Sequence, residues 1–274
     1  MSDRTLPAAP PLPVEAGVRA LSGLRLRALQ LGLLAAFFVL WEAGANAKLI
    51  DTFFFSKPTK IADTILGWAR TGDFYRDVGI TLLETAVGFV VGTVLGVALG
   101  FLFARNATIG AILNPVIVML NAIPRVLLFP LMVLWFGLSI YGKIAFATIL
   151  VFFIVFFATY TAIREVEGTL IENALILGAR SGDLTRHVLL PSALTWIFSS
   201  LRTSVGFAFI GAVVAEYLSS SDGMGHRIQL AEAFYEVHGV YGGMFVILAI
   251  ALVIDALMQR VERRFSVWKP SRGV

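Results

Sequence analysis

Cysteine is absent from this chain of 274 residues, and charged residues make up only 15% of it. The absence of cysteine excludes disulfides, thiolate nucleophiles and cysteine metal sites. The scarcity of charge, together with a mean hydropathy of +0.83, excludes an ordinary soluble domain, which could not bury so much apolar surface. A long polar stretch that could fold as a separate soluble domain is also missing. The sequence therefore predicts one all-α domain whose main solvent is lipid.

Apolar runs long enough to cross a bilayer recur along nearly the whole chain. A short helical pattern after Pro58 is typical of a helix that lies on the membrane surface. We divide the chain into a proline-rich, disordered leader over 1–24, a membrane domain over 25–265 and a cytoplasmic tail over 266–274. About six transmembrane helices are expected, over residues 26–47, 78–104, 110–136, 142–163, 191–218 and 240–260.

The basic residues predict the orientation of these helices. A formal charge of +4 and a pI near 9.6 could suggest a nucleic-acid partner. The lysines and arginines flank apolar spans instead of forming a basic face, so lipid head groups explain them and no nucleic acid is expected. Positive residues favour the cytoplasmic side, and with both termini in the cytoplasm thirteen of them lie inside and seven outside. The loop over 164–190 is then cytoplasmic.

The chain lacks the motifs of an enzyme. The segment from Gly137 to Lys143 is similar to a phosphate-binding loop, but Ile144 stands where a Ser or Thr should hold magnesium, and the segment joins two apolar spans. Metalloprotease and hydrolase motifs are missing, and the three histidines have no metal-like spacing. We expect no catalytic residue, no metal and no cofactor bound by this chain, so any energy source must be external.

Glycine recurs every fourth residue in the second expected span, at Gly88, Gly92, Gly96 and Gly100. This spacing places the four glycines on one helical face. Such a groove lets another helix approach closely. We expect tight packing inside the bundle, with a sliding or dimer surface as the alternative.

The loop between the fourth and fifth expected spans holds an apolar segment. Residues 170–177 predict one or two helical turns, Gly178 permits a bend, and Pro191 starts the next span. An apolar surface outside the membrane indicates a partner. From these residues alone, a helix resting on its own bundle or on lipid head groups is an equal alternative.

The order of residues in this loop resembles the signature E-A-A-x-x-x-G, followed after nine residues by I-x-L-P, of permease subunits in binding-protein-dependent ABC importers. Asn173 replaces the second residue of the signature and Val188 the isoleucine, and the other positions match. Segments at 123–125, 130–137, 201–202, 215–216 and 223–225 resemble the nitrate, sulfonate and taurine branch of that family.

The resemblance implies a type I importer permease in the bacterial inner membrane that functions as a homodimer. Its partners would be two ABC ATPase subunits, which carry ATP and magnesium, and an extracytoplasmic substrate-binding protein. A loop helix over 170–182 would couple to the ATPases. The implied coupling residues are Glu172, Asn173, Ala174, Leu175, Leu177, Gly178, Ala179, Arg180 and Pro191.

Charged residues inside the expected spans need partners or water, because each costs about 2.5–3.5 kcal/mol near the middle of a bilayer. One reading pairs them across helices, for instance Arg202 with Glu216. The other has Asn121 and Arg125, beside Pro124, lining a path for an anion. The candidates for the substrate path are Asn121, Arg125, Glu84, Trp135, Arg202 and Glu216.

These features favour a non-catalytic permease that imports a small solute, such as nitrate, a sulfonate, taurine, bicarbonate or an aromatic acid. The alternative is a secondary transporter coupled to an ion gradient through Glu84 or Asp255. An intramembrane enzyme is disfavoured, because no nucleophile or metal constellation is present.

Overall fold

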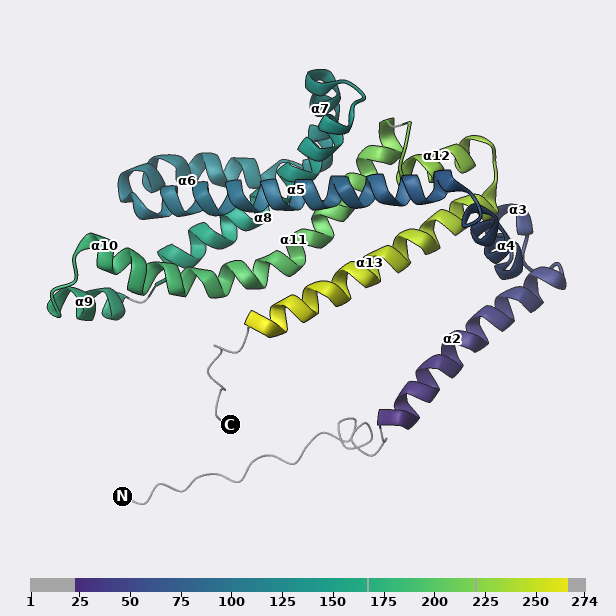
Figure 1. The fold of residues 1–274 in the computed structure, drawn as a ribbon, viewed down its shortest axis with the longest axis horizontal. Helices are drawn as coiled ribbons and strands as arrows, with labels where there is room; N and C mark the ends of the chain where they lie inside the picture. The colour runs from purple at the N-terminus through teal and green to yellow at the C-terminus, as the bar shows by residue number, and fades with distance from the viewer. Residues whose placement is uncertain (1–22, 167, 220, 266–274) are drawn as a thin grey trace, which may run out of the picture. The chain divides into compact units, whose positions relative to one another are not determined.

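The structure is a computed structural model that describes residues 23–166, 168–219 and 221–265, and within these residues every regular element is helical (Figure 1). The tail expected over 266–274, and the leader expected over 1–24 except its last two residues, lie outside this description. The chain divides into two compact units, residues 1–61 and 62–274.

The first unit contains helix α2 (Gly23–Asn46) and the short helix α3 (Thr52–Phe55). The 24 residues of α2 extend over about 36 Å, enough for a hydrocarbon core of about 30 Å. Glu42, near the end of α2, accepts hydrogen bonds from the backbone N–H and the hydroxyl of Thr59, at 3.0 and 2.9 Å. Thr59 lies in the first turn of α4 (Pro58–Trp68), so these bonds fix the chain's return after the span.

The second unit is built around α5 (Gly72–Arg105) and α8 (Ile140–Arg164), which pack along the glycine groove. A β-carbon added at Gly92 would lie 2.7 Å from both the Thr148 carbonyl oxygen and the Val151 β-carbon. One added at Gly96 would lie 2.8 Å from the Val155 β-carbon. The predicted role of the groove, tight packing inside the bundle, is therefore confirmed.

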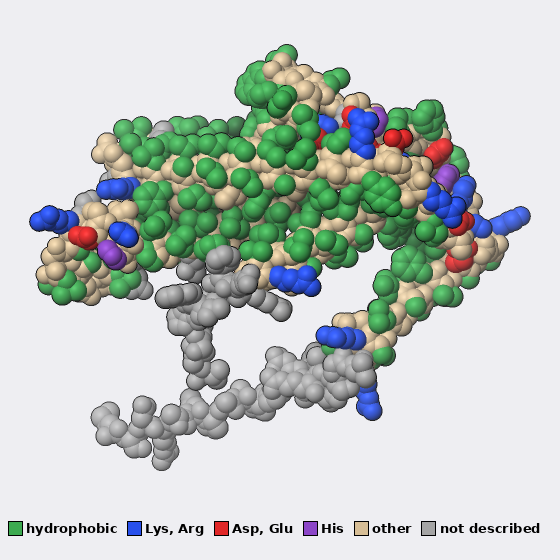
Figure 2. Space-filling view, viewed as in Figure 1, with side chains coloured by type: hydrophobic (Ala, Val, Ile, Leu, Met, Phe, Trp, Pro, Cys, Tyr) green, Lys and Arg blue, Asp and Glu red, His purple; other side chains and the backbone are tan. Residues whose placement is uncertain are grey.

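Three further helices of this unit pack against α5 and α8 or against one another. Helix α11 (Leu190–Ser219) packs on α8 and α5, α12 (Met224–Ala233) contacts α11 and α13, and α13 (Val237–Phe265) contacts both α11 and α12. Small residues of α11, including Ala208, Ala212 and Ala215, are fully buried. On the visible face, apolar side chains cover the middle of the helices and most charged side chains gather towards the ends (Figure 2).

The described residues contain five helical segments long and apolar enough to cross a membrane. The segment expected as a continuous span over 110–136 differs. It forms α6 (Ala107–Ala122), the 3-10 turn η1 (Arg125–Leu128) and α7 (Phe129–Phe136). The cause is Pro124, which lacks an N–H and forces extended backbone on Ile123, at φ −70° and ψ 125°.

The loop between α8 and α11 contains α9 (Gly168–Ile176), α10 (Ser181–Leu184) and a π-helical turn, η2 (Thr185–Leu189). The turn leads directly into α11, so Pro191 is the second residue of that helix. Within the second unit, α9 and α10 lie at the end of the bundle opposite α12 (Figure 1).

Candidate functional site

The first candidate site is the surface of α9 and the turn after it. Glu172 and Asn173 lie on α9 with exposed side chains. Leu170 and Leu175 are half exposed, at 49% and 52%, and Ile176 is 82% exposed. A helix of nine residues is too short to cross a bilayer. Because the apolar side chains of α9 are exposed, we expect another molecule to cover them.

The end of α9 is held in a defined turn. Gly178 adopts φ +86°, a left-handed conformation that favours glycine, and no other group lies near its position for a side chain. The N–H of Ala179 donates to the Ala174 carbonyl at 3.0 Å, and the N–H of Arg180 donates to the Asp183 carboxylate at 3.0 Å. The turn leaves Leu177 87% exposed. The predicted bend at Gly178 is confirmed.

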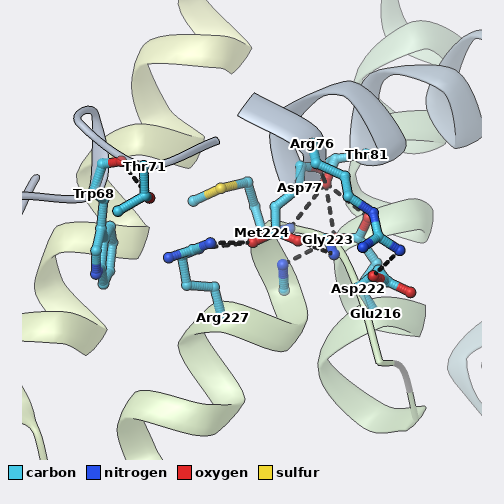
Figure 3. A network of polar contacts seen from close by, with 11 residues as sticks. Trp68, Thr71, Arg76, Asp77, Thr81, Glu216, Asp222, Gly223, Met224 and Arg227 are labelled. Atoms are coloured by element: carbon cyan, nitrogen blue, oxygen red, sulfur yellow. Dashed lines mark hydrogen bonds and ion pairs between the residues drawn. The ribbon is translucent and has the colours of Figure 1, made fainter. Parts of the chain in front are cut away.

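The second candidate site is a polar network around residues 222–225 (Figure 3). It lies at the α12 end of the unit, opposite α9 (Figure 1). Three successive backbone N–H groups at the start of α12 are held by side chains from other helices. That of Gly223 donates to Asp77 at 3.0 Å, and that of Met224 donates to the Thr81 hydroxyl at 3.0 Å. That of Gly225 donates to Glu216 at 2.8 Å. The network therefore fixes α12 against α5 and α11.

Two glycines make this arrangement sterically feasible. Gly223 adopts φ +105°, and a β-carbon there would collide with the Glu216 carboxylate. A β-carbon at Gly225 would collide with the Val213 carbonyl oxygen. The Gly-Met-Gly sequence at 223–225 is thus explained by close backbone packing.

Two carboxyl groups are completely buried in this region, those of Glu84 on α5 and Glu216 on α11. The Lys143 ammonium on α8 lies 2.6 Å from the Glu84 carboxylate, and its side chain is only 7% exposed. Glu216 also accepts from the Thr81 hydroxyl at 2.7 Å. The two carboxyls interact with each other and with the same lysine. One ammonium thus offsets two acidic groups at the meeting point of three helices.

Arg227, in the first turn of α12, binds residues of α5 and α4. Its guanidinium pairs with Asp77, with a 2.8 Å hydrogen bond from Nε, and lies over the rings of Trp68 and Phe74 at 5.2 and 5.9 Å. Arg76 pairs with Asp222 at 2.8 Å (Figure 3). Charge pairing and cation–π contact together hold Arg227 in place.

The structure corrects the suggested pairing of Arg202 with Glu216. Arg202 instead pairs with Asp255 on α13, with bonds of 3.0 and 3.3 Å, and lies 3.9 Å from Glu262. Fourteen residues separate Arg202 from Glu216 on α11, which is about 21 Å along the helix axis. Glu216 instead accepts hydrogen bonds from Thr81 and Gly225, at the α12 end of the bundle.

Lys143, which the sequence analysis did not single out, lies buried in the first turn of α8. The signal for its role was present in the sequence. A buried Glu84 requires a cation, and a lysine at the head of the neighbouring apolar span can supply one.

The remaining candidates for the substrate path lie around the break in the chain between α6 and α7. Arg125 is half-buried in η1, with its guanidinium 5.6 Å from the centre of the Phe153 ring. Trp135 on α7 is 65% exposed. The side chain of Asn121 lies outside the described part of the chain. Arg125 thus contacts α8 through Phe153, and Trp135 presents a largely exposed ring.

Comparison with known proteins identifies the family. Residues 92–267 match the family described as the inner membrane component of binding-protein-dependent transport systems. The chain belongs to this family. It is therefore a permease subunit of an ABC importer, a membrane component that does not itself catalyse a reaction.

The permease is similar to several named relatives. It is 29% identical to the putative aliphatic sulfonates transport permease SsuC of Bacillus subtilis, over 86% of each chain. It is 26% identical to the taurine transport permease TauC of Escherichia coli, over 88% of this chain and 89% of the relative. It is 29% identical to the riboflavin transport permease RibX of Chloroflexus aurantiacus, over 87% of this chain and 89% of the relative.

A solved structure supports the fold. A chain of the inward-facing MetNI methionine ABC transporter matches with a TM-score of 0.60 and 20% identity, over 69% of this permease and 94% of that chain. The likeness confirms the importer-permease architecture expected from the sequence.

Proposed function

We propose that this permease imports a small anionic solute, which it receives from an extracytoplasmic binding protein, and that α9 couples it to two ATPase subunits. The observation that carries the coupling role is the exposed apolar surface of α9, which ends in the left-handed turn at Gly178. In this arrangement two copies of the permease form the pathway, both termini are cytoplasmic, and ATP and magnesium are bound by the ATPases. The loop over 164–190 is the coupling segment.

An ATPase groove that closes over α9 would move it as a rigid body, because the turn at Gly178 and η2 connect it closely to α11. Closure of the two ATPases would then rock α11 and the helices packed on it between two states. Glu172 and Arg180 offer opposite charges beside the apolar residues. They would set the orientation of α9 in the groove.

Glu172→Arg and Gly178→Ala test the coupling role in proteoliposomes that contain the assembled importer and its binding protein. Gly182→Ala is a matched control, because Gly182 has open space and ordinary backbone in the same loop. We expect at least about a tenfold loss of ATP-driven uptake for the first two variants, with the membrane domain still folded. Normal uptake with normal ATPase binding in both would contradict the proposal.

An anionic solute is supported by the break between α6 and α7. Irregular backbone at membrane depth is tolerated where it lines a cavity or is covered by protein, and broken helices commonly bind solutes. Arg125 places a guanidinium at this break. Relatives named for sulfonates and taurine agree with this charge, whereas the riboflavin relative shows that the family's solutes vary.

The path proposal assigns Asn121, Arg125 and Trp135 to the solute. Glu84 and Glu216 are fully buried and Arg202 pairs with Asp255. These contacts favour structural roles for Glu84, Glu216 and Arg202. Arg125→Ala should lower uptake and Arg125→Lys should retain part of it, at unchanged expression. Full uptake by Arg125→Ala and Asn121→Ala variants would remove these residues from the path. Family membership disfavours the alternative of a self-contained secondary transporter.

A further inference from the structure

The turn between α12 and α13 exposes two adjacent aromatic side chains. Phe234 is 73% exposed and Tyr235 is 80% exposed. Both follow the last residue of α12, at the end of the unit opposite α9 (Figure 1). Aromatic side chains with this much exposed area are the residue type most often found as anchors at binding surfaces.

The backbone of this turn is strained. Tyr235 adopts φ +56°, where a helix ordinarily ends in glycine, and it is one of three non-glycine residues with positive φ in the described chain. Its N–H donates to the Glu232 carbonyl at 2.9 Å, and the next N–H, of Glu236, donates to the Ala231 carbonyl at 2.7 Å. A bulky residue in this conformation costs energy that glycine would avoid. Its presence therefore calls for a function of the side chain.

The helix that presents the turn is rigidly held. Arg227 and the N–H groups at 223–225 anchor the start of α12 to α5 and α11. At its other end the Tyr217 hydroxyl donates to the Glu232 carboxylate. The aromatic pair is thus preorganised, which lowers the entropy lost when a partner binds.

The segment that carries the aromatic pair is acidic. Glu232 and Glu236 flank it, and residues 228–239 contain no lysine or arginine. A groove of about 360 Å³ beside it is lined by Gln229, Glu232, Ala233 and Tyr235. Carboxylates disfavour contact with anionic lipid head groups. They suit a protein surface whose rim is basic.

We propose that Phe234 and Tyr235, with Glu232 and Glu236 at their rim, form a docking surface for the binding protein on the extracytoplasmic side. The inference rests on the proposed function for the existence and the side of this partner. It adds the permease surface that the partner contacts and the basic, apolar character of the matching surface on the binding protein.

The test measures how tightly the binding protein attaches to the assembled importer in nanodiscs, using the binding protein that stimulates ATP hydrolysis by the wild-type complex. Phe234→Ser and Tyr235→Gly should each weaken binding at least about tenfold. Tyr235→Gly should leave the thermal midpoint unchanged or raised, because glycine relieves the strain. Tyr75→Ser is the matched control, since Tyr75 is a tyrosine 63% exposed at the start of α5.

Wild-type affinity in both aromatic variants would overturn the docking surface while leaving the proposed function intact. A wild-type complex that no binding protein stimulates would overturn the proposed function and this surface with it. Ala233→Cys, labelled with a fluorophore in this cysteine-free chain, distinguishes contact with lipid head groups from docking of the binding protein. Quenching by spin-labelled lipid that the binding protein does not reduce would place the turn in the head groups and reject docking. Protection by the binding protein would support it.

Discussion

Lys143 shows how one residue can determine the stability of a junction between three helices. Its ammonium lies 2.6 Å from the Glu84 carboxylate, in a region where Glu84 and Glu216 are both completely buried. Removing one member of a buried ion pair leaves a charge without compensation, which costs much more than the pair gains. The lysine is therefore best understood as the group that makes two buried acids tolerable.

Lys143→Met should lower the stability of the folded permease by about 3–5 kcal/mol, because the Glu84 carboxyl loses its ion-pair partner. Thermal unfolding in detergent, monitored by size-exclusion chromatography, measures the change. Adding Glu84→Gln to Lys143→Met should recover most of the loss, since the neutral amide needs no counter-charge. A single variant as stable as wild type, or a double variant no better than the single, would reject this account.

For single residues, the sequence predicts which charged side chains require a partner better than it predicts which residue that partner is. Glu84, Arg202 and Glu216 were each expected to require compensation inside the membrane, and each has it. The partners depend on axial positions that only the packed helices define, and so Arg202 meets Asp255 rather than Glu216. The aromatic turn at Phe234 and Tyr235 is not predictable from the sequence, because a left-handed tyrosine has no sequence signal.

The packing of α5 on α8 depends on the absence of side chains at four positions. The groove brings the α5 backbone close to residues Ala147, Val151, Val155 and Thr159 of α8. In lipid the hydrophobic effect does not drive helices together, so close van der Waals contact of this kind supplies much of the association.

Gly92→Ala should destabilise the permease by about 1–3 kcal/mol, because its β-carbon would lie 2.7 Å from a backbone oxygen that cannot move freely. Gly79→Ala, in the same helix but with open space around it, is the control. There alanine should be neutral or stabilising by up to about 1 kcal/mol, through its helix propensity. Apparent thermal midpoints of the two purified variants give the comparison. Equal midpoints would mean that the groove is not tightly packed.

The interruption between α6 and α7 shows what sequence analysis misses at the scale of an element. The apolar run over 110–136 has the length of a span, and length dominated the prediction. Pro124 lies inside this run, and its effect on the preceding residue ends α6 altogether. Hydropathy reports the solvent of a segment, whereas proline chemistry decides whether its backbone is continuous.

For the whole molecule, fold class and family followed from the sequence because both depend on strong local signals. Long apolar runs predict spanning helices, and the spacing from Glu172 to Pro191 predicts the importer permease, which the family match confirms. Orientation across the membrane is a weaker inference, because the excess of basic residues on one side is incomplete. It remains a prediction.

The two ends of the second unit should lie on opposite sides of the membrane. Helix α11 has 30 residues and is about 45 Å long, which exceeds a hydrocarbon core of about 30 Å. The natural absence of cysteine allows single exposed reporters, Thr169→Cys in the first turn of α9 and Ser221→Cys just before α12. A membrane-impermeant maleimide applied outside should label only Ser221→Cys in spheroplasts, and should label Thr169→Cys only after permeabilisation. The reverse pattern would invert the orientation, placing α9 out of reach of cytoplasmic ATPases and Phe234 out of reach of an external binding protein.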